Sequence, residues 1–144
     1  MKLREIMSKQ VIRIHPEESV AVAARMLANY NIGILPVCGS DGRLCGLVTD
    51  RDLVTRCVAS GRPAASTPVR EVMTANIVAG KPDMDVSAAA GLMGRLQVRR
   101  LPVLENGRLC GMVSLGDLAV KEETVFDATD ALADISSGLS RRDG

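Results

Sequence analysis

The stretch Leu35-Pro36-Val37 returns as Leu101-Pro102-Val103, and this repetition decides how the fold is read. Residues 4–8, Arg-Glu-Ile-Met-Ser, return in the same register as residues 70–74, Arg-Glu-Val-Met-Thr. One residue is lost near Asp41, after which residues 42–46 match residues 107–111, both reading Gly-Arg-Leu-Cys-Gly. An internal repeat makes each copy one structural unit. The chain is therefore two copies of one motif, and positions that differ between the copies show where a paired site is unequal.

Composition limits the possible classes of protein. The 144 residues are 47% hydrophobic, with one Phe, one Tyr and no Trp, so we expect an aliphatic core. A net charge of +1 provides no broad field for nucleic acid or an anionic membrane. Four cysteines without a Cys-x-x-Cys pair, and a single histidine, argue against zinc and favour reduced thiols. The charged N-terminus, with no apolar run of membrane-spanning length, favours a cytoplasmic protein.

Each copy shows the same order of predicted elements. An opening turn is followed by a strand-like run, Val11–Ile14 or Ile77–Val78. Ser19 or Asp85 then provides a helix N-cap. Two apolar runs follow, joined by Asp-Gly or Asn-Gly, which are strong hairpin signals. A second helix starts near Thr49 or Ser114. The pattern predicts a mixed α/β (α+β) fold of two β-α-β-β-α repeats.

The boundaries between segments follow from the same pattern. We expect repeat 1 over residues 1–58, a linker over 59–68, repeat 2 over 69–120 and a tail over 121–144. In the tail, Thr124 and Asp127 have the spacing of a capping box. The sequence predicts a last helix that ends near Gly138, with residues 140–144 loose.

A hydroxyl followed three residues later by an aspartate begins the second helix of each copy. The pairs are Thr49 with Asp52, and Ser114 with Asp117. Such a pair caps a helix and suits its dipole, which is a purely structural interpretation. The same geometry suits a nucleotide, because helix starts attract phosphate and a carboxylate can accept the hydroxyls of a ribose. Spacing alone leaves both interpretations open.

The complete ordered motif set is present twice and resembles a tandem pair of CBS domains, the Bateman module. The resemblance covers residues 3–120, and within the family the chain is similar to small stand-alone bacterial proteins of the hypoxic-response type. It implies two repeats packed about a pseudo-twofold axis, with adenosine ligands bound in the clefts between them. The aspartates are expected to hold ribose and the hydroxyls to approach phosphate. The implied apolar lining is Ile12, Ile32 and Gly33 in repeat 1, and Val78 and Val98 in repeat 2.

The two copies differ where the family places a basic residue near phosphate. Arg99 and Arg100 precede Leu101, whereas Gly33 and Ile34 precede Leu35, with only Arg51 nearby. We therefore expect unequal sites, with the tighter one in repeat 2. Adjacent strand residues point to opposite faces, so one of the two arginines is expected to be solvated.

The sequence and the resemblance together predict a non-catalytic regulatory module that binds AMP, ADP or ATP as a regulatory ligand and requires no cofactor. No paired nucleophile and base is evident, so no enzyme activity is expected. Small apolar helix residues such as Ala21, Ala24, Ala28 and 88–91 predict a homodimer, which is also usual in the family. The alternatives are a ligand-free homodimeric interaction module and a binder of S-adenosylmethionine, NAD or a cyclic dinucleotide. The downstream protein partner is not identifiable.

Overall fold

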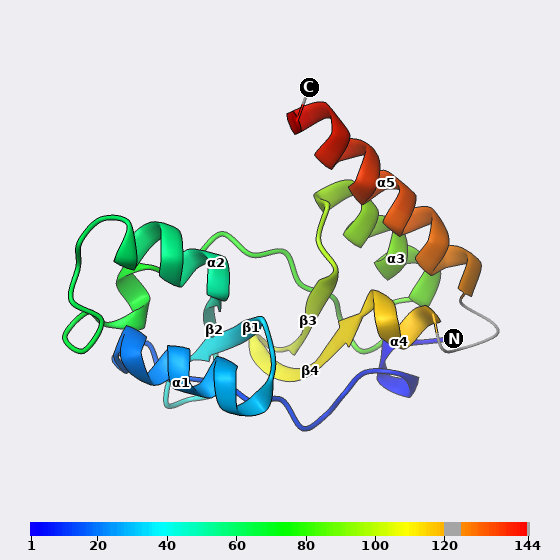
Figure 1. Cartoon of the computed structure of the whole chain (residues 1–144). Helices are drawn as coiled ribbons and strands as arrows, with labels where there is room; N and C mark the ends of the chain where they lie inside the picture. The colour runs from blue at the N-terminus through cyan, green and yellow to red at the C-terminus, as the bar shows by residue number, and fades with distance from the viewer. Residues whose placement is uncertain (120–124, 144) are drawn as a thin grey trace. The chain divides into compact units, whose positions relative to one another are not determined.

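The computed structural model describes residues 1–119 and 125–143 and divides into two compact units (Figure 1). The repeat-1 unit comprises Val11–Ile77 and Gly107–Leu109. The repeat-2 unit comprises Met1–Gln10, Val78–Asn106 and Cys110–Gly144. Among the described residues, no helix combines the length and the apolar character needed to cross a bilayer.

The opening turns of the repeats are exchanged between the units. The first turn, η1 (Leu3–Glu5), belongs to the repeat-2 unit, where the Leu3 amide donates to the Met84 carbonyl at 2.9 Å. The corresponding turn η3 (Val69–Glu71) belongs to the repeat-1 unit, where the Val69 amide donates to the Glu18 carbonyl at 2.8 Å. Leu3 and Val69 are fully buried, so each exchanged turn completes a core.

The repeat-1 unit is a helix packed on a two-stranded antiparallel sheet. Helix α1 (Val20–Tyr30) precedes strands β1 (Ile34–Cys38) and β2 (Leu44–Thr49). The short helix α2 (Asp50–Asp52) continues into the π-helical segment η2 (Leu53–Val58). Ser19 caps α1 as predicted, since its hydroxyl accepts from the Val22 amide at 3.2 Å. The buried apolar core is Ile14, Val20, Ala23, Leu27, Leu35, Val37, Val48, Leu53, Cys57, Val69 and Val72.

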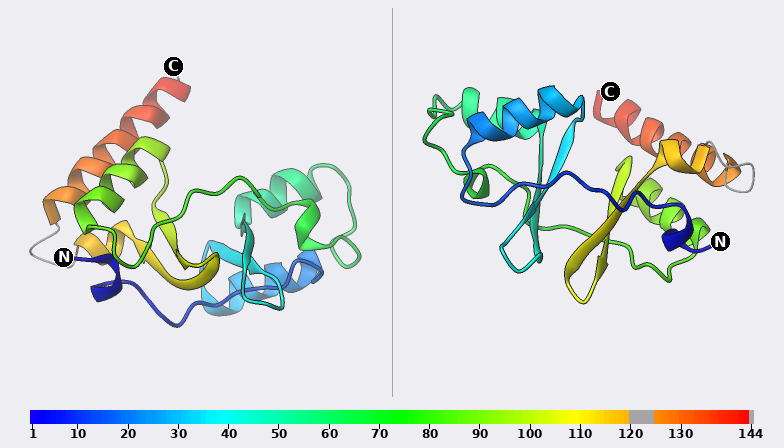
Figure 2. Two further views of the ribbon diagram at one scale, coloured as in Figure 1. Left: turned by 180° about the vertical axis from the view of Figure 1, so that it is seen from behind. Right: turned by 90° about the horizontal axis from the view of Figure 1, so that it is seen from below.

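The repeat-2 unit has the same elements and one additional helix (Figure 2). They are α3 (Val86–Leu96), β3 (Arg100–Glu105), β4 (Arg108–Ser114), α4 (Leu115–Ala119) and α5 (Val125–Asp143). The predicted hairpin is confirmed, and its turn places Asn106 and Gly107 at φ values of 54° and 79°, as a type I′ turn requires. Helix α5 packs along α3 and against α4, burying Ala128, Ala131 and Ile135.

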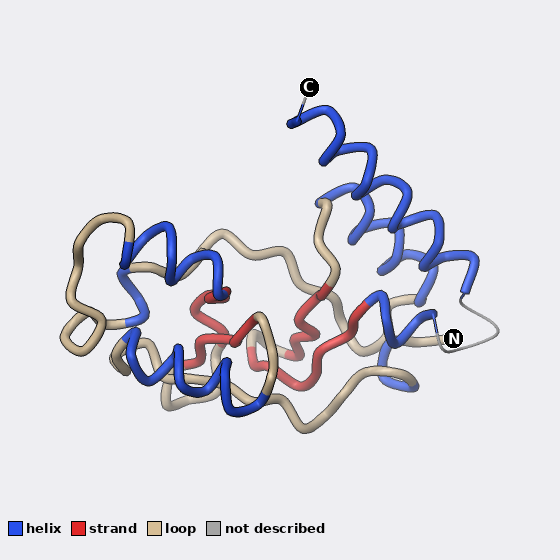
Figure 3. Tube along the Cα trace, viewed as in Figure 1, coloured by secondary structure: helices blue, strands red, loops and turns tan. Residues whose placement is uncertain are grey.

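The prediction of a first strand in each repeat was wrong, and both segments are extended loop (Figure 3). Val11–Ile14 keeps one bridge, at Ile14, whereas Ile77–Val78 makes none and the bridge of repeat 2 lies further on, at Gly80. Ile14 pairs with Val37, and Gly80 pairs with Val103, both in parallel orientation. Extending these ladders by one step would require an N–H from Pro36 or Pro102. Proline has no amide hydrogen, so the pairing stops there.

One further prediction about a helix end was wrong, and a second is confirmed only in position. Helix α5 continues past Gly138 to Asp143, and its earlier turns, up to Ile135, contribute to the repeat-2 core. Asp85 stands at the N-cap of α3 but makes no capping bond; the Val86 amide donates to the Met1 carbonyl at 2.9 Å, and the Asp85 carboxylate pairs with Lys2. The predicted capping-box residue Thr124 lies outside the described residues.

The predicted linker, residues 59–68, is hydrogen-bonded to the start of the repeat-1 helix α1. The amides at the start of α1, Val20 and Ala21, donate to the carbonyls of Thr67 and Ala64 at 2.8 and 3.0 Å. All four cysteines are free, with Cys38 and Cys57 buried.

Candidate functional site

Thr49 and Asp52 form a reciprocal pair at the end of β2. The Thr49 hydroxyl accepts from the Asp52 amide at 3.1 Å, and the Asp52 carboxylate accepts from the Thr49 amide at 3.0 Å through Oδ2. Arg56 lies one helical turn further on, with Nε 3.8 Å from Asp52 Oδ1. The capping interpretation is therefore satisfied, and one carboxylate oxygen is held in a fixed direction.

Ser114 and Asp117 repeat this geometry at the end of β4. The Ser114 hydroxyl accepts from the Asp117 amide at 3.1 Å, and Asp117 Oδ2 accepts from the Ser114 amide at 2.9 Å. Within the described part of the chain, the other carboxylate oxygen, Oδ1, has no hydrogen bond and is not buried. Each aspartate thus uses one oxygen to accept from the backbone. The second oxygen of Asp117 remains an acceptor suited to a hydroxyl donor, whereas that of Asp52 faces the Arg56 guanidinium.

The residue that precedes each central strand contacts the following helix start. The Gly33 carbonyl accepts from the Asp50 amide at 3.1 Å, and the Arg99 carbonyl accepts from the Leu115 amide at 3.0 Å. The structure therefore brings Gly33 beside the Thr49–Asp52 pair, and Arg99 beside the Ser114–Asp117 pair.

Charge differs between these two equivalent places. Repeat 1 has Gly33, Ile34, Asp50 and Arg51, whose formal charges cancel. Repeat 2 has Arg99, Arg100, Leu115 and Gly116, which carry two positive charges. Asp50 was missed by sequence reasoning as part of this site. A Cβ on Gly33 would lie 3.6 Å from Asp50 Oδ2, so an acidic oxygen faces the repeat-1 position directly.

The predicted apolar lining is distributed unevenly. Ile12 and Ile32 are partly buried against the repeat-1 core, and Val98 is partly buried against the repeat-2 core. Val78 is 46% exposed and joins no core. Arg51, Arg99 and Arg100 are all exposed. Every predicted repeat-1 site residue lies in the repeat-1 unit, and every predicted repeat-2 site residue lies in the repeat-2 unit.

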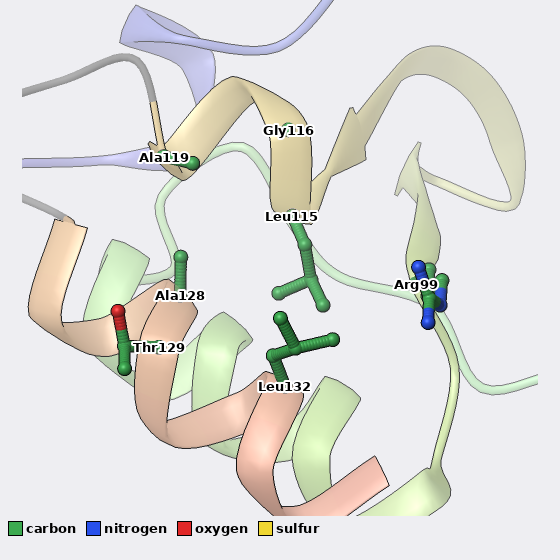
Figure 4. Close-up of a pocket in the computed structure, with 7 residues that line it drawn as sticks. All are labelled: Arg99, Leu115, Gly116, Ala119, Ala128, Thr129 and Leu132. Atoms are coloured by element: carbon green, nitrogen blue, oxygen red, sulfur yellow. The ribbon is translucent and has the colours of Figure 1, made fainter. Parts of the chain in front are cut away.

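A cavity of about 260 Å³ in the repeat-2 unit was also missed by sequence reasoning (Figure 4). Its lining combines Arg99 with residues of α4 and α5: Leu115, Gly116, Ala119, Ala128, Thr129 and Leu132. Because α5 departs from the repeat, no internal comparison could have placed it there. The described residues contain no group of three His, Cys, Asp or Glu side chains that could hold a metal ion.

Comparison with known proteins identifies the class to which this geometry belongs. The CBS domain family model matches residues 3–59 and 69–124. The chain therefore belongs to the CBS domain family, and it carries two copies of that domain, as predicted.

Three relatives illustrate the likeness. The CBS domain-containing protein YhcV of Bacillus subtilis is 40% identical over 134 residues, covering 93% of this chain and 94% of the relative. Hypoxic response protein 1 of Mycobacterium tuberculosis is 34% identical over 116 residues, covering 81% of each chain. A crystal structure of Hypoxic Response Protein I, described with two coordinated zinc ions, has a TM-score of 0.76 at 32% identity, covering 83% of this chain and 97% of that one.

One solved relative carries adenosyl ligands. The CBS domain pair of protein MJ0100, in complex with 5′-methylthioadenosine and S-adenosyl-L-methionine, has a TM-score of 0.72 at 28% identity. It covers 83% of this chain and 93% of that chain.

Proposed function

We propose that this chain is a non-catalytic regulatory module that binds an adenine nucleotide, AMP, ADP or ATP, at its two aspartate clusters, the pairs Thr49–Asp52 and Ser114–Asp117. The observation that carries the proposal is the identical construction of the two clusters. In both, a hydroxyl and an aspartate bond reciprocally to each other's backbone amides. Adenosyl binding by a relative of the same family supports a ligand-binding role for these two pairs in addition to helix capping.

The role proposed for each aspartate is to accept ribose hydroxyls. One carboxylate oxygen is fixed by a backbone amide, so the side chain does not need to be ordered when ligand arrives. Pre-organisation of this kind reduces the entropic cost of binding. The apolar side chains of Ile12 and Ile32 in repeat 1, and of Val98 in repeat 2, are proposed to contact adenine.

The proposed site in repeat 2 is the tighter of the two. Arg100 is exposed beside it and is proposed to contact phosphate, whereas Asp50 in repeat 1 would repel phosphate. A hydrogen bond to a charged group contributes about 1.5–3 kcal/mol, and tenfold in affinity corresponds to about 1.4 kcal/mol. One arginine–phosphate contact therefore separates the sites by roughly ten- to a hundredfold.

Regulation would follow from a shift between populations. A nucleotide that binds one arrangement of the module better than another favours that arrangement, and a protein partner that distinguishes the arrangements transmits the signal.

We propose that the module is a homodimer that associates through the repeat-1 helices. There, Tyr30, Val54 and Val58 are 55%, 58% and 67% exposed. The repeat-2 part of the predicted association surface is corrected, because α5 packs on α3, where Ala89 and Ala90 are buried.

A thermal-shift screen tests this proposal. Ligand at a hundred times its dissociation constant adds about 2.7 kcal/mol of stability, which raises the melting temperature of a domain of this size by several degrees. AMP, ADP and ATP should give that shift, and guanosine and cytidine nucleotides should not. If S-adenosylmethionine, NAD or a cyclic dinucleotide alone gives the shift, the ligand is a different adenosyl compound. No shift with any of them favours a ligand-free interaction module.

A further inference from the structure

We propose that the cavity between Arg99, α4 and α5 binds a small carboxylate with an unbranched apolar tail, of the class of medium-chain fatty acids. The cavity has a volume of about 260 Å³ and lies wholly within the repeat-2 unit. Its two long walls are the short helix α4 and the C-terminal helix α5. The inference goes beyond the proposed function: the cavity shares Arg99, Leu115 and Gly116 with the surroundings of the Ser114–Asp117 pair, but neither aspartate lines it.

The walls of this cavity are predominantly apolar. Leu115 of α4 and Leu132 of α5 point toward one another, with Ala119 and Ala128 further along the same space (Figure 4). Leu132 remains 42% exposed although it lies on the face of α5 that meets α4. An apolar tail between the helices would remove this leucine from water, which is favourable in proportion to the area covered.

The positive charge of Arg99, at one end of the cavity, favours a ligand with an anionic head group. Among the described lining residues, Arg99 alone is charged. Its backbone carbonyl accepts from the Leu115 amide at 3.0 Å, which anchors the residue beside α4. Within the described part of the chain its guanidinium makes no ion pair or hydrogen bond. Guanidinium binds carboxylate through two parallel hydrogen bonds, so an anionic head group fits beside Arg99.

The volume of the cavity, which is open on one side, sets the scale of the tail that it can cover. A water molecule occupies about 30 Å³ of liquid, so 260 Å³ holds roughly nine groups of that size. A carboxylate with roughly six to eight carbons is of this size. Pockets that take drug-sized molecules begin at about 300 Å³, so a whole nucleotide is too large to be enclosed here.

The residues that line this cavity are not matched at the equivalent positions of repeat 1, which provides an internal contrast. The positions equivalent to Arg99, Leu115, Gly116 and Ala119 are Gly33, Asp50, Arg51 and Val54. The repeat-1 set replaces the leucine with an acid, and the sequence contains no counterpart of α5. We therefore expect one carboxylate per chain.

Calorimetric titration of the full-length protein with butanoate, hexanoate and octanoate tests the proposal. Each added methylene that is buried should tighten binding about fourfold. Octan-1-ol, which has the same tail and no charge, should bind roughly ten- to a hundredfold more weakly than octanoate. Equal binding of octanoate and octan-1-ol, or no binding of either at millimolar concentration, would overturn the proposal.

Matched variants locate the site. Arg99→Leu should remove the preference for octanoate over octan-1-ol, and Arg99→Lys should restore most of it. Arg100→Leu alters a neighbour that does not line the cavity and should leave octanoate binding unchanged. Leu132→Glu should abolish octanoate binding by repulsion, whereas the nearly isosteric Leu132→Gln should retain part of it. Melting curves confirm that each variant is folded. Octanoate binding that is unaffected by Arg99→Leu and Leu132→Glu contradicts this site.

Discussion

The sulfur of Met73 lies over Gly46, where a Cβ would approach it to 2.6 Å. The carbonyl oxygen of Thr74 would lie 2.8 Å from the same Cβ. Met7 covers Gly111 in the same way, at 2.5 Å from a Cβ placed there. The exchanged opening segment of each repeat therefore packs on a strand that has no side chain at the point of contact.

Gly46→Ala should destabilise the protein by about 1–3 kcal/mol, the usual cost of overpacking a core. The methionine could move, but the Thr74 carbonyl cannot, because the Leu47 amide donates to it at 2.9 Å. Gly111→Ala should have a similar effect. Urea unfolding measures both changes, and unchanged midpoints would show that the exchanged segments are loosely held.

The docking of α5 depends on Gly94 in α3. A Cβ on Gly94 would lie 2.8 Å from Asp134 Oδ2 and 3.2 Å from the Cα of Ala131, both in α5. Gly94→Ala should therefore lower the melting temperature. Gly91→Ala, in the same helix, meets only the flexible Arg95 guanidinium at 3.4 Å. It should be neutral or stabilise by up to about 1 kcal/mol. Equal effects of the two substitutions would contradict the observed packing.

Burial raises the pKa of the Cys38 thiol above its ordinary value, against an opposing effect of Arg13. Above about pH 8.5, the unfolded chain then releases more protons than the folded one, so stability falls as the pH rises. Cys38→Ala should flatten this fall between pH 8 and pH 10. Urea midpoints measured in reductant provide the comparison. Parallel curves for the two proteins would mean that the Cys38 thiol contributes nothing to the pH dependence.

Dimerisation should depend on the repeat-1 helix face. Light scattering should give 2 × 15.3 kDa for the protein. Tyr30→Glu combined with Val58→Glu should give monomers, because it places charge on exposed apolar positions of α1 and η2. Leu96→Glu combined with Leu132→Glu changes exposed leucines of the repeat-2 unit and should leave the dimer intact. A monomeric parent protein, or loss of the dimer in the second variant instead, would contradict the assignment.

Much of the fold could be predicted because the sequence motif of one repeat is present twice in the chain. The repeats, the hairpins and the Ser19 cap follow from local sequence signals. The first strand of each repeat was overpredicted, because Val11–Ile14 has strand composition but its neighbour Pro36 cannot donate. The exchange of opening turns could not be found from sequence, since it depends on which core buries Leu3 and Val69.

In the candidate site, the local hydrogen-bonded pairs could be predicted from sequence, whereas the contacts between distant segments could not. The pairs Thr49–Asp52 and Ser114–Asp117 combine a local spacing with a repeat, and their hydrogen bonds follow directly from that spacing. The proximity of Asp50 to Gly33 requires the end of β2 to lie beside the residue before β1. The contribution of Leu132 to a cavity depends on where α5 docks, and no local signal reports this.

Calorimetric titration of AMP, ADP and ATP into the parent protein, Asp117→Ala and Asp52→Ala tests the central claim most directly. Each substitution removes one helix-start acid, so each should cost about 1 kcal/mol of stability, and the two variants control for each other. The account predicts that Asp117→Ala abolishes the tighter binding phase and that Asp52→Ala largely spares it. Equal weakening in the two variants would contradict the inequality of the sites. Nucleotide binding that is unchanged in both would contradict the aspartate clusters as the binding site.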